Sequence, residues 1–288
     1  MIRKLFILVV CISLATFVNG KIVEGYAIKS KILNRDVKYS VYLPENYDID
    51  SRTYPVIYML PGYSNDHTTW IHRGNIAWYA DKEIKEGKLP PVILIIPDGG
   101  VGMYVNSCDG KNNYEDFFIK EFIPQIEDIY RIKKGKFSRG IMGYSMGGWG
   151  TMLYALKYPD LFVAAAPQSS GIHDDYDILN YEDDRWEEVF GSIFGYKLKE
   201  NDRLNEYWYK NSILKIVETK SSEELRKVNF RISCGDQDYL LKGSLLLHLE
   251  LADKKVTHQL RIKAGSHNWD FWREDTPEAL EFIGSNFK

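Results

Sequence analysis

Short apolar runs closed by turn residues recur along the chain. Two early segments, residues 22–31 and 37–44, alternate apolar and polar positions and predict a β-hairpin across Asn34 and Arg35. Five later runs are apolar at successive positions, which predicts strands buried on both faces of a parallel sheet; they span residues 55–60, 91–96, 140–143, 228–234 and 256–264.

Segments with helical character separate these runs. We expect helices at residues 114–130, 147–157, 244–253 and 276–287. This alternation of strands and helices predicts a doubly wound α/β sheet. Asp, Glu, Trp and Tyr crowd residues 174–210, which contain no clear strand. We interpret about residues 172–212 as an excursion from the sheet that forms a small helical cap.

The first twenty residues differ from the rest. Arg3 and Lys4 precede a nearly continuous apolar run over residues 5–18, which is short for a membrane span but suits a signal peptide. We predict cleavage after Gly20, and therefore a secreted or periplasmic protein without a stable membrane anchor. The alternatives are an uncleaved anchor and a buried N-terminal helix.

Composition narrows the class of protein. The 288 residues are 44% hydrophobic and carry a net charge of −3, which becomes −5 without Arg3 and Lys4. This is a globular composition with no basic excess for binding nucleic acid. We expect one domain over residues 21–288. Cys108 and Cys234, the cysteines that remain, can pair in an oxidising compartment or stay as free thiols.

The clearest chemical motif follows the run at residues 140–143. Residues 143–147 read Gly-Tyr-Ser-Met-Gly, the G-x-S-x-G pattern, with an apolar strand before it and a helix after it. Such a turn lifts one hydroxyl above the sheet, and glycines allow the close approach of the neighbouring backbone. The alternative is a glycine-rich turn that carries a serine by chance. The pattern favours Ser145 as a nucleophile.

A nucleophilic serine needs a base and an acid that orients the base. His267 lies in the loop after the last predicted strand, where the carboxyl ends of the strands meet. His173 comes before the remaining strands, and we place His248 in a helix and His258 in a strand. Asp236 and Asp238 both follow the strand at residues 228–234, and spacing alone does not decide between them.

An oxyanion hole requires two backbone N–H groups. We expect one from Met146, directly after the nucleophile, and one from Tyr63, in the loop after the strand at residues 55–60. Gly62 would let the backbone approach the substrate in that loop.

These motifs together resemble the putative-esterase (esterase D-like) branch of the α/β-hydrolases, which includes the feruloyl and acetylxylan esterases of carbohydrate esterase family one. The resemblance extends from about residue 39 to residue 287. It rests on the segments at residues 58–63, 97–100, 143–148, 234–238 and 265–269, together with Trp70, Tyr104, Asn106 and Trp272. It implies an α/β-hydrolase fold with Asp238 rather than Asp236 as the acid. One departure is Pro61, where the family usually has histidine.

The resemblance also implies a function. We expect a secreted serine esterase acting on feruloyl or acetyl esters of plant cell-wall polysaccharide, with an acylated carbohydrate as partner and no metal or organic cofactor. The alternatives are an esterase or acyltransferase acting on another ester, such as a lipid, a siderophore or S-formylglutathione, and a catalytically silent glycan-binding module. The residues expected to contact substrate are Gly62, Asp66, Trp70, Tyr104, Asn106 and Trp269.

Aromatic and acidic residues of the predicted cap have two interpretations each. Tyr181, Trp186, Trp208 and Tyr209 can stack on a sugar or aryl ring, or simply pack the cap. The acidic run at residues 174–188 is expected to be a solvated face rather than a calcium site.

Overall fold

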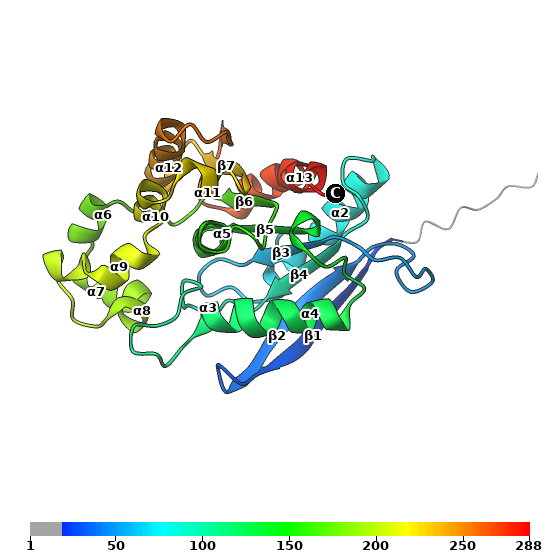
Figure 1. Ribbon diagram of the computed structural model, residues 1–288, viewed down its shortest axis with the longest axis horizontal. Coiled ribbons are helices and arrows are strands. Elements are labelled where there is room, and N and C mark those ends of the chain that lie inside the picture. Colours follow the sequence, from blue (N-terminus) through cyan, green and yellow to red (C-terminus); the bar gives the residue numbers. More distant parts are fainter. Residues whose placement is uncertain (1–18) are drawn as a thin grey trace, which may run out of the picture.

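A single eight-stranded sheet organises the protein (Figure 1). The computed structural model describes residues 19–288. The strands are β1 (Lys21–Ser30), β2 (Arg35–Leu43), β3 (Val56–Leu60), β4 (Ile93–Pro97), β5 (Arg139–Tyr144), β6 (Ala164–Gln168), β7 (Asn229–Gly235) and β8 (Gln259–Lys263). Their order is β1-β2-β4-β3-β5-β6-β7-β8. The predicted α/β architecture is confirmed.

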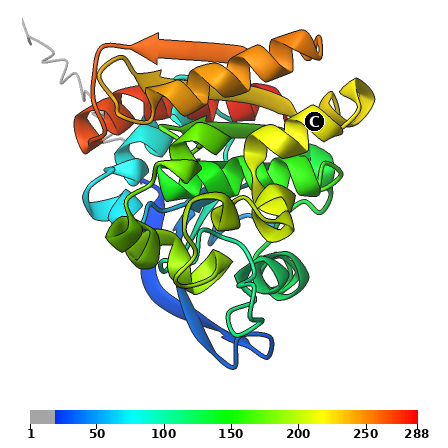
Figure 2. The ribbon, with the colours of Figure 1, turned by 90° about the vertical axis from the view of Figure 1, so that its left-hand side faces the viewer.

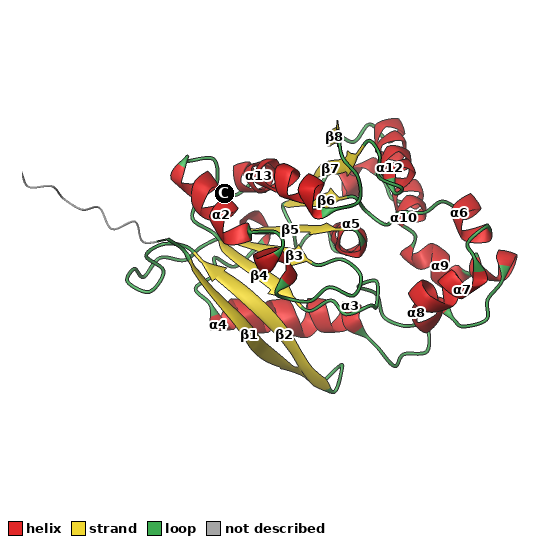
Figure 3. Cartoon of the chain, turned by 180° about the vertical axis from the view of Figure 1, so that it is seen from behind, coloured by secondary structure: helices red, strands yellow, loops and turns green. Residues whose placement is uncertain are grey.

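The sheet is parallel except at one edge. The predicted hairpin of β1 and β2 is antiparallel, and β2 also pairs antiparallel with β4. In Figure 3 these two strands form a long twisted ribbon that extends from the parallel part of the sheet. All the other pairings are parallel, so the loops after β3, β5, β6, β7 and β8 meet at one edge.

Helices cover both faces of the sheet. The α-helices are α1 (Thr69–His72), α2 (Ile76–Lys85), α3 (Tyr114–Phe117), α4 (Ile123–Ile129), α5 (Met146–Lys157), α6 (Asp175–Leu179), α7 (Asp183–Trp186), α8 (Ser192–Phe194), α9 (Glu206–Asn211), α10 (Ile213–Thr219), α11 (Ser222–Leu225), α12 (Leu241–Asp253) and α13 (Trp269–Ser285). Short π and 3₁₀ segments are η1 (Phe118–Phe122), η2 (Lys136–Ser138), η3 (Glu187–Gly191) and η4 (Glu200–Arg203). None of the helices within residues 19–288 has the length and apolar character needed to cross a bilayer. Residues 1–18 of the predicted signal peptide lie outside the described residues.

The two faces of each central strand enter different hydrophobic cores. In β3, Val56, Tyr58 and Leu60 join the core beneath α4 and α5, while Ile57 and Met59 join the core beneath α2 and α13. This alternation explains why the strand is apolar at every position, because neither of its faces meets water. The sequence pattern of buried parallel strands thus has a direct counterpart in the packing.

Strand β6 and helix α2 are among the elements that the sequence patterns do not predict. Strand β6 reads Ala-Ala-Ala-Pro-Gln, and alanine and proline have low β propensity. Its alanines are fully buried because α5 and α13 pack against the strand from opposite faces. Helix α2 was also missed, although its sequence is amphipathic. Packing against the rest of the domain, rather than local preference, decides the conformation of β6.

Several predicted boundaries need correction. Helix α13 begins at Trp269, seven residues earlier than expected, because the Asn268 side chain accepts hydrogen bonds from the N–H groups of Asp270 and Phe271. Strand β8 begins at Gln259, so His258 precedes it instead of lying within it.

The predicted cap exists as a cluster of short helices. Elements α6 to α9 lie together at one end of the molecule (Figure 1), and Figure 2 shows them facing the viewer in front of α5. Their interior contains the fully buried rings of Trp186 and Trp208, which pack around Phe190 and Phe194. For these two tryptophans, cap packing is therefore the correct interpretation, and stacking on a substrate is excluded.

One buried ion pair connects the sheet to α13. Arg231 of β7 donates two hydrogen bonds to Asp275, at 2.7 and 2.8 Å, and both side chains are at most 1% exposed. Ser233 and Gln168 also donate to this carboxylate. Burial alone would raise the pKa of Asp275, but these donors hold the pKa below its usual value.

We predict that Asp275→Asn lowers the free energy of unfolding by about 3–5 kcal/mol, because it leaves the buried Arg231 guanidinium with only the half-exposed carboxylate of Glu278 as a counter-charge. Glu278→Gln is the matched control, since Glu278 contacts the same arginine but is 48% exposed. We expect it to lower the free energy of unfolding by less than about 1 kcal/mol. Urea denaturation at neutral pH measures both values. Similar losses for the two variants would contradict the assignment. Since the pKa of Asp275 is lowered, its contribution is present at neutral pH and is lost as the pH falls through that lowered pKa.

Candidate active site

Ser145 occupies a strained turn between β5 and α5. Its backbone has φ 57° and ψ −121°, a conformation that side chains other than glycine rarely adopt. Its N–H donates to the carbonyl of Gln168 at 3.0 Å, and its own carbonyl accepts from the N–H of Gly171 at 3.2 Å. Strand β6 and the loop after it therefore hold the turn in place.

Glycines flank the serine because the turn presses against other backbone. A Cβ added to Gly147 would lie 2.0 Å from the carbonyl oxygen of Leu60, and one added to Gly143 would lie 2.5 Å from the carbonyl oxygen of Gly147. No side chain fits at these distances. The glycines of the motif are thus required by contact with the end of β3.

His267 links the serine to a carboxylate. Its Nε2 lies 2.9 Å from Ser145 Oγ, and its Nδ1 lies 3.0 and 3.1 Å from the two oxygens of Asp238. An ionised carboxylate only accepts hydrogen bonds, so Nδ1 carries the proton and Nε2 is free to accept one from the serine. This is the geometry that a serine needs to become a nucleophile.

The two aspartates after β7 have different positions. The Asp238 side chain is fully buried and also accepts the N–H of Leu240 at 2.9 Å. Burial alone would raise the pKa of Asp238, but its hydrogen bonds to His267 and Leu240 hold the pKa below its usual value. Asp236 is exposed and accepts the N–H of Gly265, so it supports the loop that carries His267. Only Asp238 contacts the imidazole.

The loop after β3 lies against the nucleophile. A Cβ on Gly62 would approach the Tyr144 ring to 2.6 Å and Ser145 Cβ to 3.4 Å. The buried Tyr104 hydroxyl donates to the carbonyl of Pro61 at 2.8 Å, which fixes the loop from below. Pro61 thus takes part in loop anchoring through its carbonyl, so the absence of histidine there leaves the loop held.

The same loop is tied to the cap. Asn65 accepts the Tyr144 hydroxyl at 2.7 Å and donates to the carbonyl of Tyr63. The Tyr63 hydroxyl in turn donates to the carbonyl of Glu188 at 2.9 Å. Met146 begins the 12-residue helix α5, whose N-terminus favours negative charge. Donation by the N–H groups of Tyr63 and Met146 to an oxyanion stays a prediction.

Three of the predicted substrate contacts are wrong. Trp70 and Tyr104 are fully buried, and Trp269 is 5% exposed. Trp70 and Trp269 pack edge to face against each other and against Tyr144, beneath the nucleophile. Large rings at these positions support the loops of the site and cannot contact a substrate.

Asn106 also has a structural role. Its side-chain oxygen accepts the N–H of Asp116, and its carbonyl accepts the Tyr207 hydroxyl. It borders a separate cavity of about 710 Å³ between α3, α5 and α10, which Tyr209 also lines. The Asp66 carboxylate accepts hydrogen bonds from Thr68, so it stabilises the start of α1. Contact of Gly62 or Asp66 with substrate stays a prediction.

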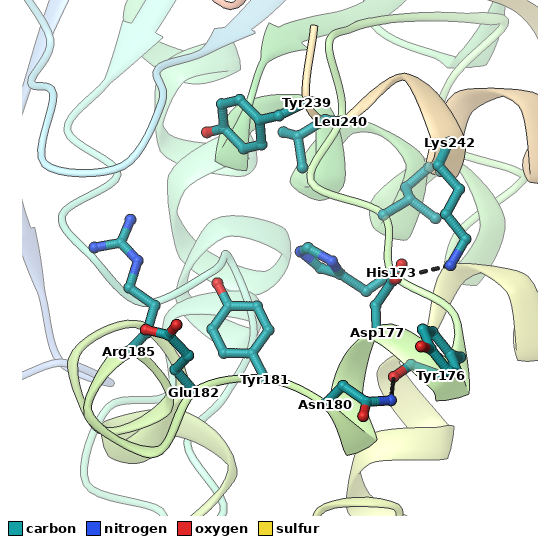
Figure 4. A pocket seen from close by; sticks show the side chains of 12 residues that line it. His173, Tyr176, Asp177, Asn180, Tyr181, Glu182, Arg185, Tyr239, Leu240 and Lys242 are labelled. Carbon is teal, nitrogen blue, oxygen red and sulfur yellow. Dashed lines mark hydrogen bonds and ion pairs between the residues drawn. The ribbon is translucent and has the colours of Figure 1, made fainter.

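A cavity of about 370 Å³ lies between the cap and the loop after β7 (Figure 4). Tyr239, directly after Asp238, lines it, and its ring lies 4.7 Å from that of His267. Residues that line the cavity include Ile172, His173, Tyr181, Arg185, Tyr239 and Leu240. Most of these residues are not among the predicted site residues. A prediction of strand β6 would have placed His173 in the loop at a strand end, and the position of Tyr239 directly after Asp238 is a second signal.

The acidic run is compensated by bases. Lys242 pairs with Asp174 and Asp177, and Arg185 pairs with Glu188. Within residues 19–288 no group of three or more His, Cys, Asp or Glu side chains is arranged to hold a metal ion. Cys108 is exposed and Cys234 is buried, and the two are free thiols.

Several esterases are similar to this chain. An esterase of Mycobacterium tuberculosis is 32% identical over 148 residues, which covers 50% of this chain and 31% of that protein. The chain thus matches about a third of the length of that relative. An acetyl esterase of Caldicellulosiruptor saccharolyticus is 23% identical, with 88% of this chain and 95% of that protein covered. A solved ferulic acid esterase superposes with a TM-score of 0.79 at 26% identity, covering 94% of this chain and all of that one.

A family model covers nearly the whole folded domain. The model described as "Putative esterase" matches residues 30–283, which include Ser145, Asp238 and His267. The chain therefore belongs to the putative esterase family of α/β-hydrolases.

Proposed function

We propose that this protein is an exported serine esterase that hydrolyses feruloyl or acetyl esters on plant cell-wall polysaccharide. The observation that carries the esterase chemistry is the continuous chain of hydrogen bonds from Ser145 through His267 to Asp238. The acetyl esterase and ferulic acid esterase among the similar proteins support the choice of acyl group. The predicted signal peptide supports export, since acylated polysaccharides lie outside the cell.

The proposed mechanism follows from the positions of these atoms. Ser145 Oγ attacks the ester carbonyl while His267 Nε2 takes its proton, and buried Asp238 stabilises the resulting imidazolium. The N–H groups of Tyr63 and Met146 bind the oxyanion of the tetrahedral intermediate. His267 then protonates the leaving alcohol. Water, activated by the same imidazole, attacks the acyl-enzyme and releases the acid and free Ser145.

The folded domain supports the proposed cleavage site. Strand β1 begins at Lys21, directly after the predicted cut. The Gly20 N–H donates to Asp81, but Tyr42 donates to the same carboxylate oxygen, so the contact between β2 and α2 does not depend on residue 20. A chain that begins at Lys21 retains the whole sheet.

We predict that Asp238→Asn lowers kcat by about 10⁴-fold, because the imidazole loses the carboxylate that holds its tautomer. Asp236→Asn is the matched control. It leaves every triad contact in place and is expected to retain most of the activity. Initial rates on p-nitrophenyl acetate measure both. Greater loss in Asp236→Asn than in Asp238→Asn would overturn the assignment of the acid.

The substrate class is tested with a panel of esters. The purified protein is expected to release ferulate from methyl ferulate or acetate from acetylated xylan, and Ser145→Ala is expected to release neither. The panel also includes S-formylglutathione and long-chain p-nitrophenyl esters. A preference for one of those would replace the polysaccharide assignment, and binding of glycan by both proteins without any hydrolysis would indicate a silent binding module.

Export is tested by expressing the full chain in a secreting bacterial host. We expect protein outside the cytoplasm whose intact mass and N-terminal sequence correspond to a start at Lys21. Replacing Leu8 and Val9 with aspartate breaks the apolar run and is expected to keep the protein inside the cell. Full-length protein found only in the cytoplasm or the membrane would contradict the proposal.

A further inference from the structure

The cavity between the cap and the loop after β7 has a direct connection to each catalytic residue. Ile172 and His173 follow Gly171, whose N–H is bonded to the Ser145 carbonyl. Leu240 donates its N–H to Asp238, and the ring of Tyr239 contacts that of His267. Residues that line the cavity are thus neighbours of the triad in the chain or in direct contact with it. The volume of the cavity, about 370 Å³, lies within the ~300–1,000 Å³ range of small-molecule sites.

Part of the cavity wall is aromatic or apolar. Tyr181, Tyr239 and His173 provide rings around it, and Ile172 and Leu240 provide apolar surface. Two of the bases near the cavity are paired, Lys242 with Asp174 and Asp177, and Arg185 with Glu188; the carboxylate of Glu182 also lines the cavity. Such walls suit a flat, uncharged ring better than a sugar, because a sugar has a hydroxyl on most of its carbons and each would need a polar partner.

His173 is the polar group held in a fixed orientation at this site. Its imidazole packs edge to face against Tyr181 and Phe190, with ring centroids 5.7 and 5.9 Å apart. In Figure 4 it points into the cavity between Tyr181 and Tyr239. Among residues 19–288, no hydrogen-bond partner is found for its ring nitrogens. Burial lowers the pKa of His173 despite the opposing effect of Asp177 and Asp174, so the ring is neutral and keeps one nitrogen as an acceptor.

The segment that carries His173 is rigidly placed. A Cβ on Gly243 of α12 would lie 2.1 Å from the carbonyl oxygen of Ile172, so the helix and this segment are in close contact. The hydrogen bond from Gly171 to Ser145 fixes the other side. The position of the imidazole relative to the nucleophile is therefore set by the fold, as a specificity residue requires.

We propose that His173 selects acyl groups that carry an aromatic hydroxyl, by accepting a hydrogen bond from that hydroxyl while the ring lies between Tyr181 and Tyr239. This inference rests on the proposed esterase function. It adds that the cavity binds the acyl side of the ester and that His173 recognises the acyl group. A hydroxylated ring satisfies the imidazole, whereas an unsubstituted ring leaves it without a partner.

The test compares methyl 4-hydroxycinnamate with methyl cinnamate, which differ by one hydroxyl. We expect wild-type kcat/KM to be about ten-fold higher for the hydroxylated ester. In His173→Phe, which keeps a ring but has no acceptor, the ratio of the two values is expected to fall close to one. His173→Gln is expected to restore part of it. The control is His72→Phe, an equal substitution at an exposed histidine that pairs with Glu24, and its ratio is expected to match wild type.

Other outcomes would contradict either the role of His173 or the esterase function. Equal wild-type rates on the two esters, or an unchanged ratio in His173→Phe, would overturn the role of His173 while leaving the esterase function intact. If His173→Phe instead loses preference for a sugar ferulate over methyl ferulate, the cavity holds the alcohol side and the proposal is wrong. Absence of turnover by wild-type protein on every ester would overturn the proposed function itself.

Discussion

The contact between the turn at Ser145 and the end of β3 is the constraint on which the site depends. Gly147 approaches the Leu60 carbonyl so closely that no side chain fits, and Ser145 is held at positive φ as a result. This strain is tolerated because β3 and β5 are paired neighbours, and hydrogen bonds from β6 and the loop after it fix the other side of the turn. The hydroxyl is thereby raised above the strand ends, where His267 reaches it.

Burial and hydrogen bonding together set the charge state of Asp238 in the triad. Asp238 is removed from water yet ionised, since an imidazole N–H and a backbone N–H both donate to it. Asp236, two residues earlier, accepts a hydrogen bond from Gly265 and so supports the loop that carries His267. The two carboxylates differ in role because one faces the interior and the other faces solvent, not because of their chemistry.

The cap contacts both the cavity and the loop after β3. It contributes Tyr181 and Arg185 to the cavity, and the Glu188 carbonyl of the same cap accepts a hydrogen bond from the Tyr63 hydroxyl in the loop after β3. Its tryptophans belong to the core beneath α5, where Trp208 packs against Trp149, and this packing holds the short helices in a fixed position. The same core explains why Trp186 and Trp208 are unavailable for binding, because both rings are fully buried in it.

Local sequence determined the nucleophile, the base and the strands around them. The glycines around Ser145 and the runs that are apolar at every position reflect local requirements of a tight turn and of strands buried on both faces. Both patterns are therefore visible in the sequence itself. The tertiary structure alone decided the rest. It made a strand of the alanines in β6, buried Trp70 and Tyr104, left Asp238 as the aspartate in contact with His267, and brought His173 and Tyr239 to one cavity. These outcomes depend on which distant segments meet, and burial and hydrogen bonding at such contacts outweigh the preference of any residue taken alone.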